Sequence, residues 1–190
     1  MRHKDDRKRE AIGNAAIELI TTIGFADTSM SKIAKAAKVS PATIYVYFEN
    51  KEDLLNQTFL MVKRETSEAV LAGFNEDLSV EAGFRLIFEN GCRYVLAEPI
   101  KFAFSEQFGH SPLVNRVSRE EGMGYFQTVQ TLFARGKQEG VIKDIPYSIF
   151  RAVFFAPQIY LWKQHRADEV VFDETLRIQT FEFIWDAVTI

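Results

Sequence analysis

The chain has 190 residues, 47% hydrophobic and 26% charged, which is enough apolar content for a buried core beneath a soluble surface. No apolar run reaches the eighteen residues of a membrane span, and the first ten residues lack the apolar stretch of a signal peptide. A single cysteine, Cys92, excludes an intrachain disulfide. We therefore expect a cytoplasmic protein with no membrane partner.

The formal charge of -3 is unevenly distributed. Residues 1–50 carry eight Lys and Arg against six Asp and Glu, whereas residues 51–190 have a net charge of -5. A local positive excess favours an anionic partner, although a modest asymmetry is equally typical of a solvated surface.

Helical periodicity begins near the N-terminus. Apolar residues at helical spacing predict a first helix over about 6–23, and Gly24 follows where a left-handed residue ends a helix well. Thr28 and Ser29 offer oxygens that cap a short second helix over 30–38.

A third helix is predicted to start sharply. Ser40 followed by Pro41 combines a capping serine with a proline at the first helical position. The helix PATIYVYF is two turns long, and Ile44 and Phe48, four residues apart, define its inward face.

The rest of the chain also reads as helices. Asn50, with Asp53 three residues on, starts a fourth helix that extends to about residue 74. Further helices are expected over about 79–97, 99–109, 112–140, 146–165 (kinked at Pro157) and 173–188. The predicted fold is all-α: an N-terminal helix-turn-helix DNA-binding domain of three helices (1–50), joined by the long fourth helix to a helical ligand-binding and dimerisation domain (51–190).

The outward face of the third helix suits DNA. Thr43, Tyr45 and Tyr47 present hydroxyls, while Pro41 and Ala42 are small enough for close approach to bases. Lys51 lies in the first turn of the fourth helix, where a cation opposes the helix dipole, and a bound phosphate would explain its position. Each feature alone is also common on ordinary surfaces.

Together these residues closely resemble the N-terminal domain of the tetracycline-repressor (TetR) family, over roughly residues 7–60. The matching elements are Gly24-Phe25, Thr28, Ser29, Ile33-Ala34, Ala37, Val39-Ser40, Ile44-Tyr45, Tyr47-Phe48, Lys51-Glu52 and Leu54. The resemblance implies a homodimer that binds a pseudo-palindromic double-stranded DNA operator, with two recognition helices in successive major grooves.

The resemblance also implies which residues contact DNA. The expected set is Thr28, Ser29, Lys38, Ser40, Pro41, Ala42, Thr43, Tyr45, Tyr47 and Lys51, with Pro41, Ala42 and Thr43 nearest the bases. Lys38 stands where the family usually has glycine. If this residue must adopt a positive φ, lysine costs up to about 1 kcal/mol relative to glycine, and we hypothesise that a phosphate contact by Lys38 compensates for this cost. Because the helix lacks Arg, Asn and Gln, specificity is expected to depend on thymine methyls and DNA shape. A flexible arm containing Arg2, Lys4, Arg7, Lys8 and Arg9 could touch the backbone, or be a plain solvated tail.

Fifteen of the seventeen phenylalanines lie beyond residue 50. Most are expected to be core, but the family's C-terminal domain binds an inducer, so the resemblance implies a small apolar or aromatic effector in a cavity between helices. The candidate ligand-binding residues are Phe88, Tyr94, Phe104, Glu106, Gln107, Phe108, His110, Tyr125 and Trp162.

The last two helices are the expected dimer interface, as in the family. The apolar candidates are Phe150, Phe154, Leu161, Leu176, Phe183, Ile184 and Val188, although ordinary intrachain core explains such a stripe as well. An effector that favours the wrong separation of the two DNA-binding heads would release DNA, with the fourth helix as the lever.

Two alternatives remain. An enzyme is disfavoured because His3, His110 and His165 are scattered and no catalytic or metal-binding motif appears, so no cofactor or metal is expected. The other alternative keeps the DNA-binding head but lacks a small-molecule sensor.

Overall fold

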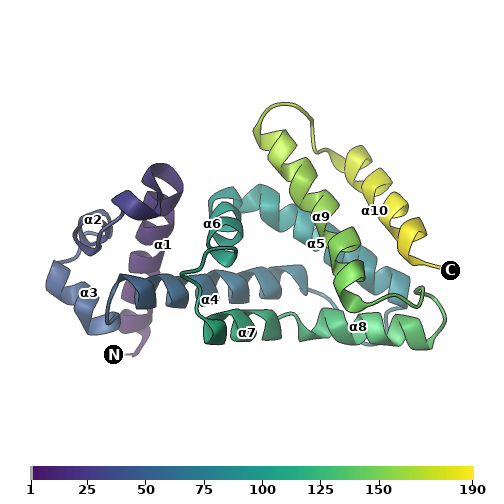
Figure 1. The fold of residues 1–190 in the computed structure, drawn as a ribbon, viewed down its shortest axis with the longest axis horizontal. Coiled ribbons are helices and arrows are strands. Elements are labelled where there is room, and N and C mark those ends of the chain that lie inside the picture. Colours follow the sequence, from purple (N-terminus) through teal and green to yellow (C-terminus); the bar gives the residue numbers. More distant parts are fainter. Residues whose placement is uncertain (1) are drawn as a thin grey trace. The chain divides into compact units, whose positions relative to one another are not determined.

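Every regular element of the described part of the chain is a helix. The computed structural model describes residues 2–190, with side chains from Asp5 onward. The helices in that part are α1 (Arg2–Asp27), α2 (Met30–Ala36), α3 (Pro41–Tyr47), α4 (Lys51–Val70), α5 (Val80–Ala97), α6 (Pro99–Gly109), α7 (Arg116–Gly124), α8 (Gln127–Gln138), α9 (Tyr147–Arg166) and α10 (Glu174–Val188) (Figure 1). The predicted all-helical class is confirmed.

The chain forms two compact units. Unit 1 runs up to Glu65 and also includes Glu98–Tyr125, while unit 2 consists of Thr66–Ala97 and Phe126–Ile190. Helices α6 and α7 therefore belong to the same unit as the predicted DNA-binding head, and α4 contributes residues to both units. The functional division at residue 50 stays a prediction.

Helix α1 begins earlier than predicted. Arg7, Lys8 and Arg9 lie on this helix and are exposed, so they do not form a flexible arm, and a contact of their side chains with the DNA backbone stays a prediction. The side chains of Arg2 and Lys4 lie outside the described part. Gly24 has φ 80°, so the predicted positive φ at the end of the first helical segment is confirmed.

The starts of α2 and α3 follow the predicted capping residues. Ser29 Oγ accepts a hydrogen bond from the Lys32 N–H at 3.3 Å, and Ser40 Oγ accepts one from the Thr43 N–H at 3.1 Å. Each bond satisfies an N–H that a helix start otherwise leaves unpaired, which is worth about 1 kcal/mol. Apolar residues of α1, α2, α3 and α4 share one buried core, which includes Ile12, Ala16, Ile20, Ile33, Ala34, Ile44, Phe48, Leu54 and Leu55.

Helix α4 starts as predicted and ends earlier. Asn50 Oδ1 accepts from the Asp53 N–H and Asp53 Oδ2 accepts from the Glu49 N–H, both at 2.9 Å, which closes a reciprocal cap. The predicted extension to residue 74 is wrong, because α4 ends at Val70. The amide of Asn90 donates to the carbonyls of Val70 and Ala72 at 3.0 and 2.9 Å, which satisfies acceptors at the helix end.

The single helix predicted over 112–140 is wrong. The segment forms α7 and α8, and the chain between them includes Phe126, whose φ of -105° and ψ of 19° interrupt the helix. Asn115 caps α7 by accepting from the Ser118 N–H at 2.8 Å. The chain before it is held by Asn56, which donates to Leu113 O at 3.0 Å and accepts from the Asn115 N–H at 3.1 Å. A buried side chain from α4, which periodicity does not reveal, therefore fixes the start of α7.

Aromatic rings fill the core of unit 2. The rings of Phe84, Phe150 and Phe154 lie with centroids 4.9–5.2 Å apart, and Phe181 stacks on Trp185 at 5.8 Å. Such pairs each contribute about 0.5–1.5 kcal/mol beyond the burial of their area. Helix α9 continues through Pro157.

Candidate nucleic-acid interface

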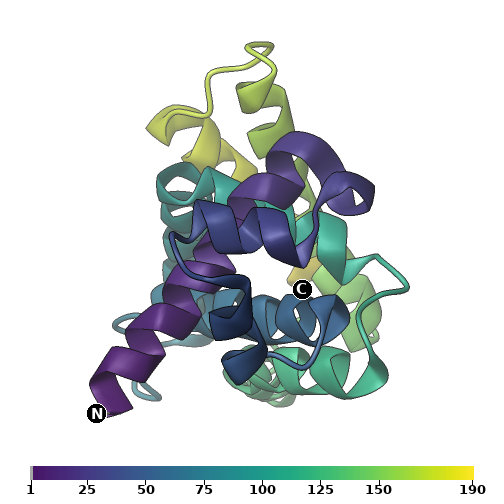
Figure 2. The ribbon, with the colours of Figure 1, turned by 90° about the vertical axis from the view of Figure 1, so that its left-hand side faces the viewer.

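Helix α3 has one buried side and one open side. Ile44 and Phe48 are buried against the rest of unit 1, as predicted. Pro41, Ala42 and Tyr45 are exposed, and Tyr45 shows 58% of its surface to solvent. Figure 2 faces the part of unit 1 that contains α1, α2 and α3. The open side of α3 is the surface on which a recognition helix would read DNA.

The turn before α3 holds Lys38 at a positive φ. Lys38 is exposed and has φ 56°. The Lys38 N–H donates to Lys35 O at 3.2 Å and the Val39 N–H donates to Ala34 O at 3.0 Å, which is the Schellman pattern of a helix C-terminus. Glycine is the usual residue at this position of the motif, so lysine is held here at a cost of up to about 1 kcal/mol.

Tyr47 is already engaged by an acidic residue of α1. Its hydroxyl donates to Asp5 Oδ1 at 3.0 Å. Desolvation, followed by the hydrogen bond and the charge of Asp5, raises the pKa of Tyr47, while the charge of Arg9 lowers it. The hydroxyl therefore stays protonated, which is the form that donates to a carboxylate or to a DNA phosphate oxygen.

Lys51 also has an intramolecular partner. Its ammonium group donates to the carbonyl of Phe25, near the end of α1. Similarly, the ammonium group of Lys32 donates to Asp27 O at 2.7 Å, a contact that the sequence did not suggest. The position of Lys51 at a helix start therefore has a reason besides phosphate binding, and a phosphate contact by Lys51 stays a prediction.

Thr28 needs a correction. Only 2% of its surface is exposed, and its hydroxyl donates to Gly24 O at 2.7 Å. The Thr28 side chain holds the turn that follows Gly24 and is too buried to contact DNA. Ser29, its neighbour, is exposed.

Two surface features of unit 1 escaped the sequence reasoning. Val46 was not among the expected contacts, yet 76% of its surface is exposed on α3. A hollow of about 390 Å³ lies beside the Lys38 turn, and it is lined by Arg7, Lys8, Ala11, Ala37 and Val39. A helical wheel centred on Ile44 would have singled out Val46.

Family comparisons match both halves of this arrangement. Residues 12–58 match the family described as bacterial regulatory proteins, tetR family, and residues 80–189 match the family described as tetracyclin repressor-like, C-terminal domain. The chain belongs to the TetR family. It is a DNA-binding transcription regulator with a helix-turn-helix head and a helical C-terminal domain.

Individual relatives agree with this assignment. The crystal structure of a TetR family transcription regulator from Marinobacter aquaeolei VT8 is 32% identical, with a TM-score of 0.94 over 100% of this chain and 99% of that one. The fatty acid metabolism regulator protein of Bacillus subtilis is 28% identical over 133 residues, 69% of each chain. The transcriptional regulator FadR from Bacillus subtilis, solved in complex with stearoyl-CoA, shares the fold at 22% identity, with a TM-score of 0.76 over 92% of this chain and 96% of that one.

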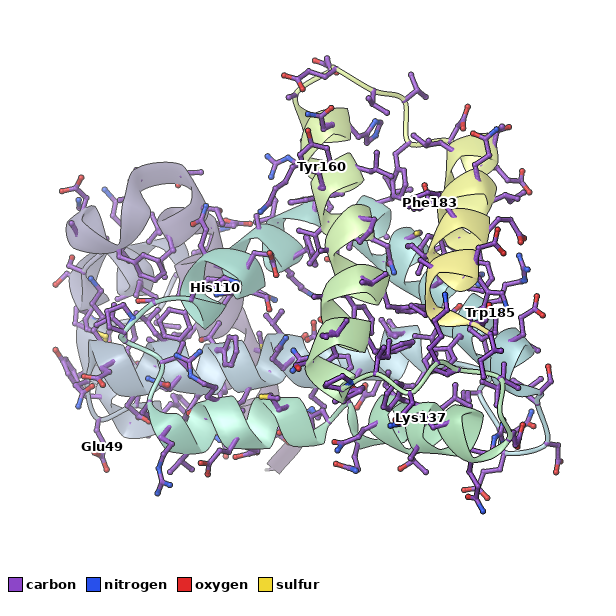
Figure 3. The ribbon with its side chains drawn as sticks, turned by 45° about the vertical axis from the view of Figure 1, so that its right-hand side comes forward. Glu49, His110, Lys137, Tyr160, Phe183 and Trp185 are labelled. Atoms are coloured by element: carbon purple, nitrogen blue, oxygen red, sulfur yellow. The ribbon has the colours of Figure 1, made fainter. Side chains whose placement is uncertain are left out.

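Among the ligand-binding candidates of this TetR-family chain, six lie in unit 1. Phe104 and Phe108 are completely buried, stack at 5.5 Å, and belong to the core that also contains Phe25 and Phe59. Tyr125 donates to Glu121 Oε1 at 2.7 Å. Glu106 is half-buried, whereas Gln107 and His110 are exposed at the end of α6, where Figure 3 labels His110.

The other three candidates lie in unit 2. The ring of Phe88 is completely buried against Phe154 and Phe181, with centroids 6.2 and 5.4 Å away. The indole N–H of Trp162 donates to Val95 O at 3.1 Å, and Tyr94 is buried. Phe88 and Trp162 therefore have structural roles, and an effector contact by any of the nine candidates stays a prediction.

The dimer-interface candidates divide by exposure. Four candidates are buried in the core of the protomer itself, as the alternative of an ordinary intrachain core expects: Phe150, Phe154, Ile184 and Val188. Leu161 and Leu176 are half-buried. Phe183 is 77% exposed, and Tyr160 is 62% exposed although the sequence reasoning missed it; Figure 3 labels both. A dimer contact by Phe183, Leu161 or Leu176 stays a prediction.

Other kinds of site find little support in the described residues. No group of three His, Cys, Asp or Glu side chains among them is arranged to hold a metal ion. Burial raises the pKa of the Cys92 thiol to about 12, which makes it a poor nucleophile. No helix in residues 2–190 is both long and apolar enough to cross a membrane.

Proposed function

We propose that this regulator is a repressor that binds a pseudo-palindromic operator as a homodimer and is released by a small apolar effector. The observation that carries the DNA-binding part is the open side of α3, where small and hydroxyl-bearing residues are exposed beside lysines. Lys32, Lys35 and Lys38 are exposed on α2 and its following turn. An apolar and hydroxyl-rich centre flanked by cations fits a groove bordered by phosphates.

The proposed contacts fall into two classes. Ser29, Lys38, Tyr45, Tyr47 and Lys51 are assigned to phosphates, since ammonium groups and hydroxyls donate to phosphate oxygens. Ser40, Pro41, Ala42 and Thr43 form the leading end of α3, nearest the bases. For Ser40 and Thr43 the two hydroxyl oxygens already lie 2.8 Å apart. We accordingly propose that Ser40 and Thr43 mainly stabilise the first turn of α3, which lies close to the major groove.

The proposed dimer forms through the exposed faces of α9 and α10. Ile149, Ala152, Ala156 and Tyr160 are exposed at helical spacing along α9, and Phe183 is exposed on α10. Large exposed apolar side chains such as Tyr160 and Phe183 are stabilised when an apolar surface of a second protomer covers them. A two-fold axis brings the same surface of both protomers together. The two heads would then read half-sites about one helical turn, 34–36 Å, apart.

The proposed effector is an apolar compound, with a fatty-acyl chain as the first class to test. The support comes from the match to a repressor-like C-terminal domain and from two similar proteins, one named for fatty acid metabolism and the other solved with stearoyl-CoA. Because α4 contributes to both units, it is the proposed lever between effector and head. The alternative without a sensor predicts no effect of any such compound on DNA release.

The test starts from an unbiased selection. The purified full-length chain is used to enrich duplexes from a random library, and the enriched duplex is then titrated by fluorescence anisotropy with and without stearoyl-CoA. The proposal expects an inverted repeat with half-site centres about 10–10.5 base pairs apart, and weaker binding when the acyl compound is present. An enriched site without two-fold symmetry would refute the dimeric reading. Unchanged binding with acyl compounds of all chain lengths would refute this effector class.

A further inference from the structure

The open side of α3 has an apolar centre. Successive residues of an α-helix are turned by about 100°, so the residues two before and two after Ile44 lie on the opposite side. These residues are Ala42 and Val46. They are four apart and therefore lie one above the other. Because Ile44 is completely buried, this pair occupies the middle of the exposed side, with Tyr45 and Thr43 at its flanks.

No packing among the described side chains explains an apolar residue at position 46. It is 76% exposed, whereas the buried side of α3 consists of Ile44 and Phe48. A β-branched residue also lowers helix propensity slightly, so the helix does not require it. An exposed apolar side chain at the centre of a DNA-reading surface has one complementary group in the major groove, namely the 5-methyl group of thymine.

The other residues of α3 offer no strong hydrogen-bonding alternative to apolar contacts with thymine methyl groups. Its sequence, PATIYVY, contains none of the Arg, Asn or Gln side chains that make paired hydrogen bonds to guanine or adenine. We infer that Val46, supported by Ala42, is a specificity-determining residue that contacts a thymine methyl in each half-site of the operator. This inference rests on the proposed function and adds to it the residue and the chemical group that are recognised.

The test replaces individual thymines of the selected operator by uracil, which removes only the methyl group. For the wild-type chain, one position in each half-site should lose affinity by about fourfold per methyl, the value of one buried methyl-sized group, and about fifteenfold when both half-sites are changed. Val46→Ala should bind the thymine operator correspondingly more weakly and lose its sensitivity to uracil at that position.

The matched control is Val117→Ala. Val117 is likewise an exposed valine on a helix of unit 1, with 66% of its surface open, and it lies on α7. This variant should keep the wild-type uracil penalty. Circular dichroism checks that both variants remain helical.

The outcomes separate the inference from the function on which it rests. If the wild-type chain enriches no duplex, the proposed function fails. If it binds a selected operator but no thymine-to-uracil change costs affinity, or if Val46→Ala retains the full uracil penalty, the assignment of Val46 is overturned while operator binding stands.

Discussion

Replacing Lys38 by glycine separates the two roles of the turn between α2 and α3. Lys38 has φ 56° in a Schellman turn that glycine adopts without strain. Lys38→Gly should therefore raise the free energy of unfolding by up to about 1 kcal/mol. For a chain of this length that gain corresponds to an increase in Tm of about 2–4 °C. Thermal and urea unfolding of the purified protein measure it.

The same substitution should weaken DNA binding if the ammonium group contacts a phosphate. Each lost phosphate contact reduces the slope of log Kd against log salt by about 0.9, so a dimer that loses two contacts should show a slope smaller by about 1.8. Anisotropy titrations at salt concentrations between 50 and 200 mM give the slope. Over this range the affinity of a protein with about 6–10 phosphate contacts falls measurably.

Asp168→Gly provides the matched control. Asp168 is another non-glycine residue with positive φ, 57°, and it lies in unit 2 after α9. Its replacement should stabilise the protein by a similar amount and leave the salt slope of DNA binding unchanged. A Lys38→Gly protein with the wild-type salt slope would refute the phosphate contact, and one with reduced stability would refute the strain argument.

Three further predictions follow from the contacts described above. Asp5→Ala should tighten operator binding several-fold, because the Tyr47 hydroxyl then donates to a phosphate without first leaving a carboxylate. Phe183→Glu should sediment as a monomer and remain helical, because the Phe183 side chain is exposed on the proposed interface. Phe154→Ala should instead lower the free energy of unfolding by about 3–5 kcal/mol, because the Phe154 side chain fills the core. Cys92 should react with a thiol reagent at pH 8 only after unfolding. Since its folded pKa of about 12 exceeds the ordinary value of 9.0, its contribution to stability should be complete below pH 9 and be lost as the pH rises toward 12.

Asp6 offers a control for the Asp5→Ala variant. Asp6→Ala removes the same charge from the exposed start of α1, so an equal gain in affinity from Asp6→Ala would mean that charge alone, and not the Tyr47 hydrogen bond, matters. A dimeric Phe183→Glu protein would move the interface away from α10. Rapid labelling of Cys92 in the folded protein would show that its surroundings open readily.

Local signals in the sequence were sufficient for the DNA-binding head. Ser40-Pro41 defines the start of α3 because its capping bond and fixed φ act within one turn, and the structure shows that bond. The positive φ of Gly24 was likewise readable from the end of its helical segment, whereas the positive φ of Lys38 was only a conditional expectation, raised by the glycine that is usual there in the family. The family assignment followed from the same short segment, which agrees with the match over residues 12–58.

Contacts between distant residues were not readable. The start of α7 is held by Asn56 and the end of α4 by Asn90, and both side chains bond to backbone groups far away in the sequence. The Lys51 contact to Phe25 O likewise joins residues far apart in the sequence. Thr28, in contrast, bonds to the Gly24 carbonyl only four residues away, and periodicity gave no sign of its burial. On α9 and α10, both sides carry apolar residues, so periodicity alone did not separate Phe154 in the core from Phe183 on the surface.

The most direct test of DNA recognition by α3 is the ratio of two dissociation constants, one for the selected operator and one for a random duplex of equal length, measured at the same moderate salt concentration. Reading of base edges by the exposed side of α3 predicts that the operator binds at least about a thousandfold more tightly. Equal affinities for the two duplexes would contradict it.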